Sequence, residues 1–381
     1  MFTGRKSICN ISPYQNLRCD SKGIPINETL TMVFMERQIR FDVMPDVDNV
    51  DNDHDYSNRK TALQGNRLMQ KFYELYSRSS DEVISSVPSS QQYSISQPHS
   101  KLLKKKKQEQ RSLLICYATA GYPDAQITKE IISHMIHAGA DIIEIGIPFS
   151  DPIPDGPIIQ EASFIALSNG MTPEKSLQIV KDIRKRFSEI PIVLMTYSNI
   201  LVKAGLSEFL GKARESGADG FILPDMPIEE ASDFVKEATR LNLATVFLAS
   251  PNTEEERLRN IASKSTGFLY LISTYGTTGI RDSFDRSTAG YIRNARRIVG
   301  PSLPIAVGFG ISKPQHAKFM INAGADAIIV ASAIINIIRL YEMHQKNKKK
   351  DSKSIKEKRM KDLLAHIDDF VSSMKEACMR Q

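Results

Sequence analysis

The sequence contains no tryptophan, and only four of its 381 residues are cysteines. No two cysteines have the spacing of a metal-binding or redox motif, so we expect reduced, structural thiols in a reducing compartment such as the cytoplasm. They are Cys9, Cys19, Cys116 and Cys378. The cysteines therefore predict no metal site and no disulfide framework.

Long apolar segments are missing as well. The longest apolar run, Ala327 to Ile338, includes Ser332 and Asn336 and is too short to cross a bilayer. The N-terminal stretch "MFTGRKSICNISPYQNLRCD" lacks the apolar core that a secretory signal needs. We therefore expect neither a transmembrane helix nor a signal peptide.

The net charge of +6 is modest, and much of the excess lies in two lysine-rich runs, residues 104–107 and 346–361. Aromatic residues do not interleave with these lysines, which argues against a nucleic-acid-binding surface. We expect the two runs to form solvated helix or linker.

Residues 1–108 differ from the rest of the chain. They contain an acidic patch, "FDVMPDVDNVDNDHDY", and a Ser/Gln-rich stretch, "SSVPSSQQYSISQPHS", without sustained helix or strand periodicity. This pattern predicts a mostly disordered N-terminal extension in which "NRLMQKFYELYSRS" forms at most a short helix. Truncation before about Lys101 is therefore expected to leave the activity of the remaining domain, residues 109–381, unchanged.

A regular alternation of short β-branched runs and amphipathic helical stretches begins at Leu113. Continuous apolar strands that alternate with helices are typical of a parallel sheet covered on both faces. Eight such units predict the α/β fold class and a closed (β/α)8 TIM barrel; a doubly wound open sheet is the alternative. The runs are "LLICYATAG", "DIIEIGIPF", "PIVLMTY", "GFILPDMP", "ATVFLASP", "GFLYLIST", "PIAVGFGIS" and "AIIVASAII".

Glu144 is a carboxylate within the second apolar strand, and the active site of such a barrel lies at the C-terminal strand ends. Burial raises the pKa of a carboxyl group, so Glu144 is a candidate general acid and base near neutral pH. The bland alternative is a glutamate held by a neighbouring Lys or Arg, and no obvious basic residue lies near the adjacent strand ends.

Asp151 and Asp155 follow Glu144 in a loop with four prolines. An aspartate before proline or glycine often only starts a turn, and Asp151 fits that pattern. A loop stiffened by prolines is, however, suited to holding one carboxylate accurately, which favours a functional role for Asp155.

The loops after the last strands are candidates for a phosphate site. "GFGIS" (residues 308–312) and "ASA" (residues 331–333) follow the seventh and eighth strands, where backbone amides and a helix N-terminus often hold a phosphate. "YGTTG" (residues 275–279) follows the sixth strand and is either an ordinary mobile loop or a lid over the substrate.

The motifs "YATAGYP", "IEIGIPFSDPIPDGP", "ILPDMP", "YLISTYGTTG" and "GFGIS", in this order, closely resemble those of the tryptophan synthase alpha subunit family. The sixth-strand motif is more similar to archaeal members. The resemblance implies retro-aldol cleavage of indole-3-glycerol phosphate to indole and glyceraldehyde 3-phosphate, without a metal or a cofactor in this chain. It also implies an αββα complex with a beta subunit that carries pyridoxal phosphate.

The resemblance assigns roles residue by residue. Glu144 corresponds to the catalytic acid and base, and Asp155 to the acid that accepts a hydrogen bond from the indole N–H. The corresponding substrate-binding residues are Tyr117, Tyr270, Gly279, Phe309, Gly310, Ala331 and Ser332. The sequence departs from the commonest pattern at Thr274, Pro154 and Ala331, and Asp151 is expected at the subunit interface.

Three alternatives to an alpha subunit that works in a complex remain open. One is a stand-alone lyase that releases free indole. Another is a catalytically inert barrel that activates a beta subunit, although the intact Glu144, Asp155 and Tyr270 argue against it. The third is a different phosphate-binding barrel enzyme, which usually needs a second acid/base or a lysine at a strand end.

Overall fold

The computed structural model describes residues 65–84, 112–272, 286–301, 303–308, 310–346 and 353–379. These residues belong to one compact unit of the chain. Three residues of the expected site, Thr274, Gly279 and Phe309, lie outside the described residues, as do Cys9 and Cys19. The described thiols, Cys116 and Cys378, are free and buried.

Eight parallel strands form a closed barrel in chain order, and β1 pairs with β8 to close it. The predicted (β/α)8 fold is therefore confirmed, and the alternative of an open doubly wound sheet is wrong. The strands are β1 (Leu113–Thr119), β2 (Ile142–Gly146), β3 (Ile192–Met195), β4 (Gly220–Ile222), β5 (Ala244–Ala249), β6 (Leu269–Ile272), β7 (Ile305–Gly308) and β8 (Ala327–Val330).

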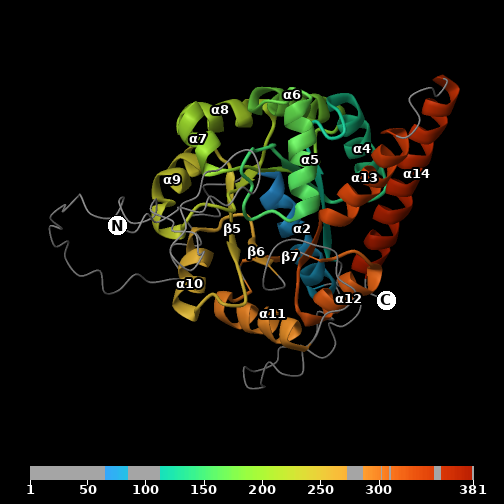
Figure 1. The fold of residues 1–381 in the computed structure, drawn as a ribbon. Coiled ribbons are helices and arrows are strands. Elements are labelled where there is room, and N and C mark those ends of the chain that lie inside the picture. The colour runs from blue at the N-terminus through green and yellow to red at the C-terminus, as the bar shows by residue number, and fades with distance from the viewer. Residues whose placement is uncertain are drawn as a thin grey trace, which may run out of the picture. The chain divides into compact units, whose positions relative to one another are not determined.

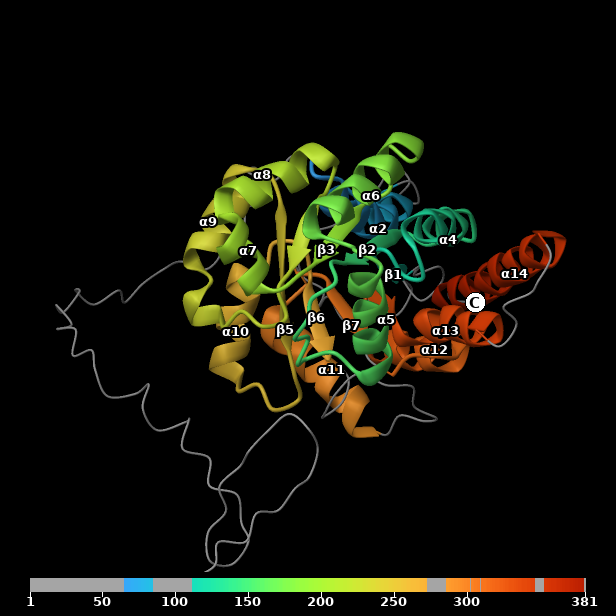
Figure 2. The same cartoon turned by 45° about the horizontal axis from the view of Figure 1, so that its top comes forward.

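Helices surround the strands, as Figures 1 and 2 show. Several helices begin at residues that favour a helix start; for example, Asp124 is the N-cap residue of α4, and its carboxylate accepts hydrogen bonds from the first free amides of the helix. The helices are α4 (Ala125–His137), α5 (Pro157–Ser168), α6 (Pro173–Arg186), α7 (Ser198–Ala204), α8 (Leu206–Ser216), η1 (Ile228–Glu230), α9 (Ser232–Arg240), α10 (Glu255–Lys264), α11 (Arg286–Val299), α12 (Pro314–Ala323), α13 (Ser332–Lys346) and α14 (Lys353–Cys378). No described helix combines the length and the apolar character needed to span a membrane.

The apolar residues of the strands divide into two cores because successive side chains point to opposite faces of a strand. One set, which includes Leu114, Cys116 and Ile143, packs outward against the helices. The other set, which includes Ile115, Ile142 and Val193, fills the interior of the barrel. The strands are thus buried on both faces, which explains their nearly continuous apolar sequences.

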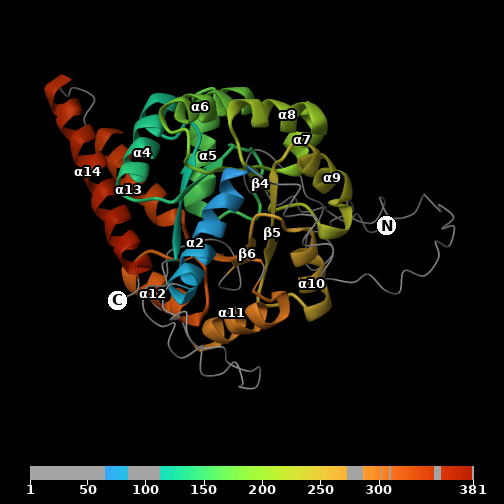
Figure 3. The same cartoon turned by 180° about the vertical axis from the view of Figure 1, so that it is seen from behind.

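Helix α2 (Arg67–Ile84) comes from the N-terminal extension and lies against the barrel in Figure 3. Its apolar residues belong to the interior cluster of the barrel. Leu68 is fully buried and Phe72 is 2% exposed, and both join the interior cluster. The ring of Phe72 lies 5.8 Å from that of Phe268, which precedes β6. The helix therefore closes the end of the barrel at which the strands begin.

Polar contacts hold α2 in this position. The Asn66 side chain donates hydrogen bonds to the backbone oxygens of Asp219 and Asn242, which precede β4 and β5. Arg67 pairs with Asp219 Oδ1 at 2.5 Å, and Arg184 of α6 pairs with Oδ2 at 2.7 Å. The Asp219 carboxylate is fully buried, and among the described residues its partners are these two arginines and the Ile192 amide, which stabilise its charge. The sequence pattern predicted at most a short helix here and did not indicate that it packs into the barrel. The predicted domain boundary at 108/109 stays a prediction.

Candidate active site

Glu144 occupies the middle of β2, between Tyr117 of β1 and Val193 of β3 in register. The side chain lines a cavity and is only 1% exposed. Its Oε2 atom has no hydrogen-bond partner among the described residues. Burial first, and the neighbouring Asp155 second, raise the pKa of this carboxyl group from 4.5 to about 8. Glu144, the predicted general acid and base, is thus buried, its Oε2 atom has no partner among the described residues, and its pKa lies close to neutral pH.

Asp155 lies in the loop between β2 and α5, and its side chain lines the same cavity. The backbone of the loop is fixed locally, since the Asp155 amide donates to the Pro152 oxygen at 2.9 Å and Gln160 donates to the Asp155 oxygen at 2.8 Å. The Tyr197 hydroxyl donates to Asp155 Oδ2 at 2.6 Å. Burial raises the pKa of Asp155 from 3.8 to about 6, and the hydrogen bond from Tyr197 opposes this rise.

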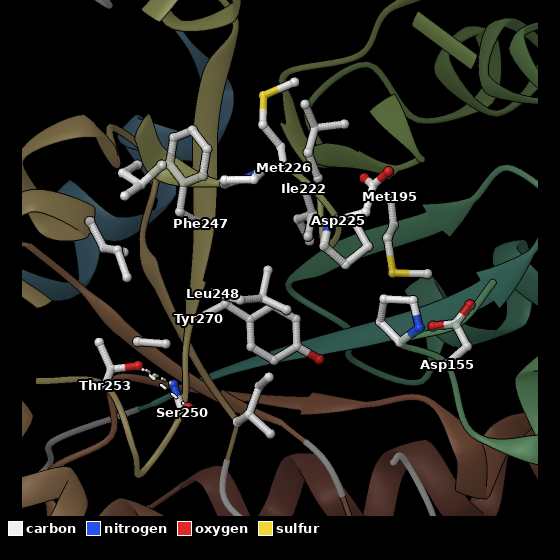
Figure 4. A pocket seen from close by; sticks show the side chains of 18 of the residues that line it. Asp155, Met195, Ile222, Asp225, Met226, Phe247, Leu248, Ser250, Thr253 and Tyr270 are labelled. Atoms are coloured by element: carbon white, nitrogen blue, oxygen red, sulfur yellow. Dashed lines mark hydrogen bonds between the residues drawn. The ribbon is translucent and has the colours of Figure 1, made fainter. Parts of the chain in front are cut away.

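The cavity has a volume of about 520 Å³ and lies at the C-terminal strand ends. Figure 4 shows its apolar side chains, among them Met195, Ile222 and Leu248 from β3, β4 and β5. The Tyr270 hydroxyl points towards the side of the cavity where Asp155 lies. The two acids therefore face a largely apolar space, as is usual for a small-molecule binding site.

Two glycines make room for the predicted tyrosines. A Cβ atom on Gly146 would lie 2.1 Å from the hydroxyl oxygen of Tyr117, and one on Gly308 would lie 2.5 Å from that of Tyr270. Real Cβ atoms essentially never approach so closely. The strand glycines thus allow both phenol groups to lie across the top of the barrel interior.

The predicted phosphate-binding residues are only partly within the described structure. Ala331 follows β8 and lines the cavity, and Ser332 is the first residue of α13. Gly310 is buried and has a φ of 75°, a backbone conformation that favours glycine. Their role in binding phosphate stays a prediction, as does that of Gly279 and Phe309.

The structure therefore brings Tyr117, Glu144, Asp155, Tyr270 and Ala331 together around one cavity. Pro154, one of the departures from the family pattern, also lines it. Asp151 does not line the cavity; it is exposed and accepts a hydrogen bond from Ser150. Within the described ranges, no group of three or more His, Cys, Asp or Glu residues is placed to hold a metal ion.

The sequence pattern assigned no role to two residues of the site. Tyr197 lies two residues after the end of β3 and donates a hydrogen bond to Asp155. Only its place near the end of a barrel strand could have suggested a role. Asp225 follows β4 and lines the cavity, and it holds the N-terminus of α7 through Ser198. Its place after a barrel strand marks Asp225 as a candidate site residue in the sequence, but no role follows from that position alone.

Comparison with known proteins agrees with the motif resemblance. A family model described as "Tryptophan synthase alpha chain" matches residues 103–365. The tryptophan synthase alpha chain of Pyrococcus abyssi is 48% identical over 226 residues, which are 59% of this chain and 89% of the relative. That of Methanococcus maripaludis is 44% identical over 231 residues, which are 61% of this chain and 88% of the relative. The expected similarity to archaeal members is confirmed.

Solved structures give the same result. A tryptophan synthase complex from Pyrococcus furiosus contains a chain with 37% identity and a TM-score of 0.59, and the match covers 69% of this chain and 98% of that one. Tryptophan synthase from Mycobacterium tuberculosis matches with 27% identity and a TM-score of 0.61, covering 71% and 94%. Sequence and fold therefore point to the same relatives.

Proposed function

The chain belongs to the tryptophan synthase alpha chain family, and we propose that it cleaves indole-3-glycerol phosphate to indole and glyceraldehyde 3-phosphate. One observation carries this proposal above all. Glu144 and Asp155 line the same cavity but have different surroundings: burial raises the pKa of Glu144 to about 8, whereas the hydrogen bond from Tyr197 opposes the effect of burial on Asp155, whose pKa is raised to about 6. Near pH 7, one acid is therefore protonated and the other ionised, which is how a pair of carboxyl groups takes two different roles.

In the proposed reaction, Glu144 gives its proton to C3 of the indole ring. The positive charge that develops on the ring is stabilised by the Asp155 carboxylate, which accepts a hydrogen bond from the ring N–H. The ionised Glu144 then takes the proton of the glycerol hydroxyl as the carbon–carbon bond breaks, so that an aldehyde and neutral indole form. Glu144 is therefore protonated again at the end of each cycle, and no oxidant or reductant is needed.

The apolar wall of the cavity supports this assignment. Met195, Ile222 and Leu248 offer the ring an apolar environment, in which a hydrogen bond to Asp155 is stronger than in water. The substrate phosphate is assigned to the other end, near Ala331 and Ser332, where α13 begins.

The partner and cofactor assignments follow from the family. We propose that this chain acts with a beta subunit in an αββα complex, that it has no cofactor of its own, and that the pyridoxal phosphate belongs to the partner. The similar Pyrococcus furiosus structure is described as a tryptophan synthase complex. The exposed Asp151 and Ile153 in the loop after β2 would be available to such a partner.

The test is steady-state cleavage of indole-3-glycerol phosphate, followed as glyceraldehyde 3-phosphate formation while beta subunit is titrated in. Cleavage that rises with the beta subunit supports the complex, and full cleavage by the isolated chain supports a stand-alone lyase. No cleavage above background under either condition would mean that the proposed activity is wrong.

The pH profile of this reaction is a sharper prediction. The value of kcat/KM is expected to fall below about pH 6, where Asp155 becomes protonated, and above about pH 8, where Glu144 loses its proton. The bell-shaped profile is measured with the enzyme in its working complex across about pH 5 to 9, roughly one unit beyond each limb. A profile that is flat across both limbs would contradict the assignment of the two acids.

Gly308 offers a test of the cavity geometry. The substitution Gly308→Ala places a methyl group against the Tyr270 ring, so the ring must leave its position in the cavity. We expect kcat/KM to fall roughly tenfold or more. Gly290→Ala on α11 is the matched control, because a Cβ atom there meets nothing within 4 Å. Equal activity of the two variants would show that the position of Tyr270 is unimportant.

A further inference from the structure

A hydrogen bond between Tyr197 and Asp155 links two loops at the mouth of the barrel. Tyr197 lies two residues after the end of β3 at Met195, is 2% exposed, and donates a hydrogen bond to Asp155 Oδ2 at 2.6 Å. Its ring stacks on Phe149 of the loop after β2, with centroids 4.8 Å apart and planes inclined by 26°. The hydroxyl group is therefore held in one place by the packing of its own ring.

Asp225 holds the backbone next to Tyr197. Both Asp225 carboxylate oxygens accept hydrogen bonds from the Ser198 amide, at 3.0 and 3.1 Å, and Oδ2 also accepts one from the Ser198 hydroxyl at 2.5 Å. Tyr197 is the N-cap residue of α7, and no side-chain hydrogen bond of its own caps the helix. The acid after β4 thus supplies the cap and ties three consecutive loops together.

Of the two carboxylate oxygens of Asp155, Oδ2 accepts the hydrogen bond from Tyr197 and Oδ1 does not. Among the described residues, no hydrogen bond reaches Asp155 Oδ1. Since Asp155 lines the cavity, the occupied Oδ2 restricts the rotation of the carboxylate, and Oδ1 is left to accept a hydrogen bond from a ligand.

We propose that Tyr197 is a positioning residue that keeps the Asp155 carboxylate ionised and oriented towards the ring N–H of the substrate, with Asp225 fixing Tyr197 from behind. This inference rests on the proposed function for the identity of the ring N–H. A phenol that donates to a carboxylate stabilises its ionised form, and a fixed orientation avoids reorganisation during the reaction.

The charged and titratable groups around Asp155 are consistent with Tyr197 holding the Asp155 carboxylate in its ionised form. Glu144 of β2 faces it from within the barrel, and the hydroxyl groups of Tyr117 and Tyr270 face the same acids from β1 and β6. Burial and the neighbouring acids raise the pKa of Tyr197 far above its usual range, so its hydroxyl keeps the proton it donates. Its hydrogen bond lowers the pKa of Asp155 against the effect of burial.

The direct test follows the carboxyl group itself and does not depend on catalysis. The full chain is labelled with 13C at aspartate side-chain carboxyl carbons, and the Asp155 signal is assigned by its loss in Asp155→Asn. In Tyr197→Phe, the midpoint of the Asp155 titration is expected to move up by about one pH unit, because the Asp155 carboxylate loses a hydrogen bond. An unchanged midpoint would overturn the proposal.

Two further variants test whether the effect on Asp155 is specific to the Tyr197 hydroxyl or follows from any loss of packing in the barrel. Tyr122→Phe removes a hydroxyl from another buried tyrosine, whose charged neighbours are Glu161, Glu342 and Arg339, and should leave the Asp155 midpoint unchanged. An equal shift in this variant would show that any buried phenol has the same effect, and it would overturn the proposal. Ser198→Ala should move the midpoint by a smaller amount in the same direction as Tyr197→Phe. No movement in Ser198→Ala would overturn the part assigned to Asp225.

Kinetics then connect the titration to the reaction. In Tyr197→Phe, the acid limb of kcat/KM should move up together with the Asp155 midpoint, while the basic limb, assigned to Glu144, should stay in place. An acid limb that does not move would overturn the catalytic part of the proposal. If the wild-type chain cleaves no indole-3-glycerol phosphate, the proposed function fails, whereas the carboxyl titration still decides whether Tyr197 controls Asp155.

Discussion

Replacing Glu144 by glutamine is expected to lower kcat for the cleavage of indole-3-glycerol phosphate by about 10²- to 10⁴-fold, the usual contribution of general acid–base catalysis. Glutamine keeps the shape of the side chain but can neither give a proton to the ring nor take one from the glycerol hydroxyl. The value of KM should change little, because the cavity that binds the ring is unaltered. Single-turnover cleavage in the presence of the beta subunit measures the loss.

The same substitution should not harm the fold, and the pH dependence of unfolding provides the control. Burial raises the pKa of Glu144 in the folded chain to about 8, against an ordinary value of 4.5 for a glutamate in water. Between these values the unfolded chain loses the proton and the folded chain keeps it, so the stability of the wild type falls as pH rises. The Glu144→Gln variant escapes this loss and should become the more stable protein, by on the order of 5 kcal/mol at most above pH 8.

Chemical denaturation of both proteins at pH 5 and pH 8.5 measures this difference. A stability gap that opens with pH, together with lost activity, would show that the burial of Glu144 costs stability in return for a neutral-range proton carrier. A variant that keeps full cleavage would contradict the catalytic assignment, whatever its stability. A gap that stays constant with pH would show that Glu144 does not keep its proton in the folded chain.

The parts of the fold that depend on local patterns could be predicted from the sequence. The eight apolar runs coincide with the eight strands because strands buried on both faces need continuous apolar residues. Glu144 was recognisable for the same reason, since a carboxylate within such a run must be paired or used. The position of Asp155 was recognisable from the prolines around it.

Contacts between distant segments could not be predicted in this way. The bond from Tyr197 to Asp155 joins residues that are far apart in sequence and come from different loops. A tyrosine after β3 has no pattern that tells a positioning role from ordinary packing. The place of α2 is a second example, because its apolar stripe marks a helix that is buried on one side and does not say which surface covers it.

Deleting α2 is expected to destabilise the barrel severely, in contrast to the neutral truncation that the sequence pattern suggested. Burial of Leu68 and Phe72 contributes about 3–6 kcal/mol together, a large part of the stability of a typical domain. The deletion also leaves the buried Asp219 carboxylate without Arg67. Thermal unfolding of a chain that starts at Gly65 and of one that starts after Ile84 isolates the contribution of α2.

Point substitutions in the full chain make this comparison more exact. Phe72→Ala should lower the free energy of unfolding by about 3–5 kcal/mol, because a large ring is removed from a closed interior. Gln70→Ala, at an exposed position of the same helix, should change it by less than about 0.5 kcal/mol. Equal stability of the two variants would mean that α2 rests on the barrel without supporting it.

The loss should reach the site as well as the fold. The Phe72 ring contacts Phe268, and the Phe268 ring lies 6.4 Å from that of Tyr270, whose hydroxyl projects into the cavity. A void at the floor of the barrel therefore removes support from a residue at its mouth. In Phe72→Ala, kcat/KM should fall at temperatures well below the unfolding midpoint, whereas in Gln70→Ala it should not. A catalytic rate that stays at the wild-type value until the protein unfolds would limit α2 to a stabilising role.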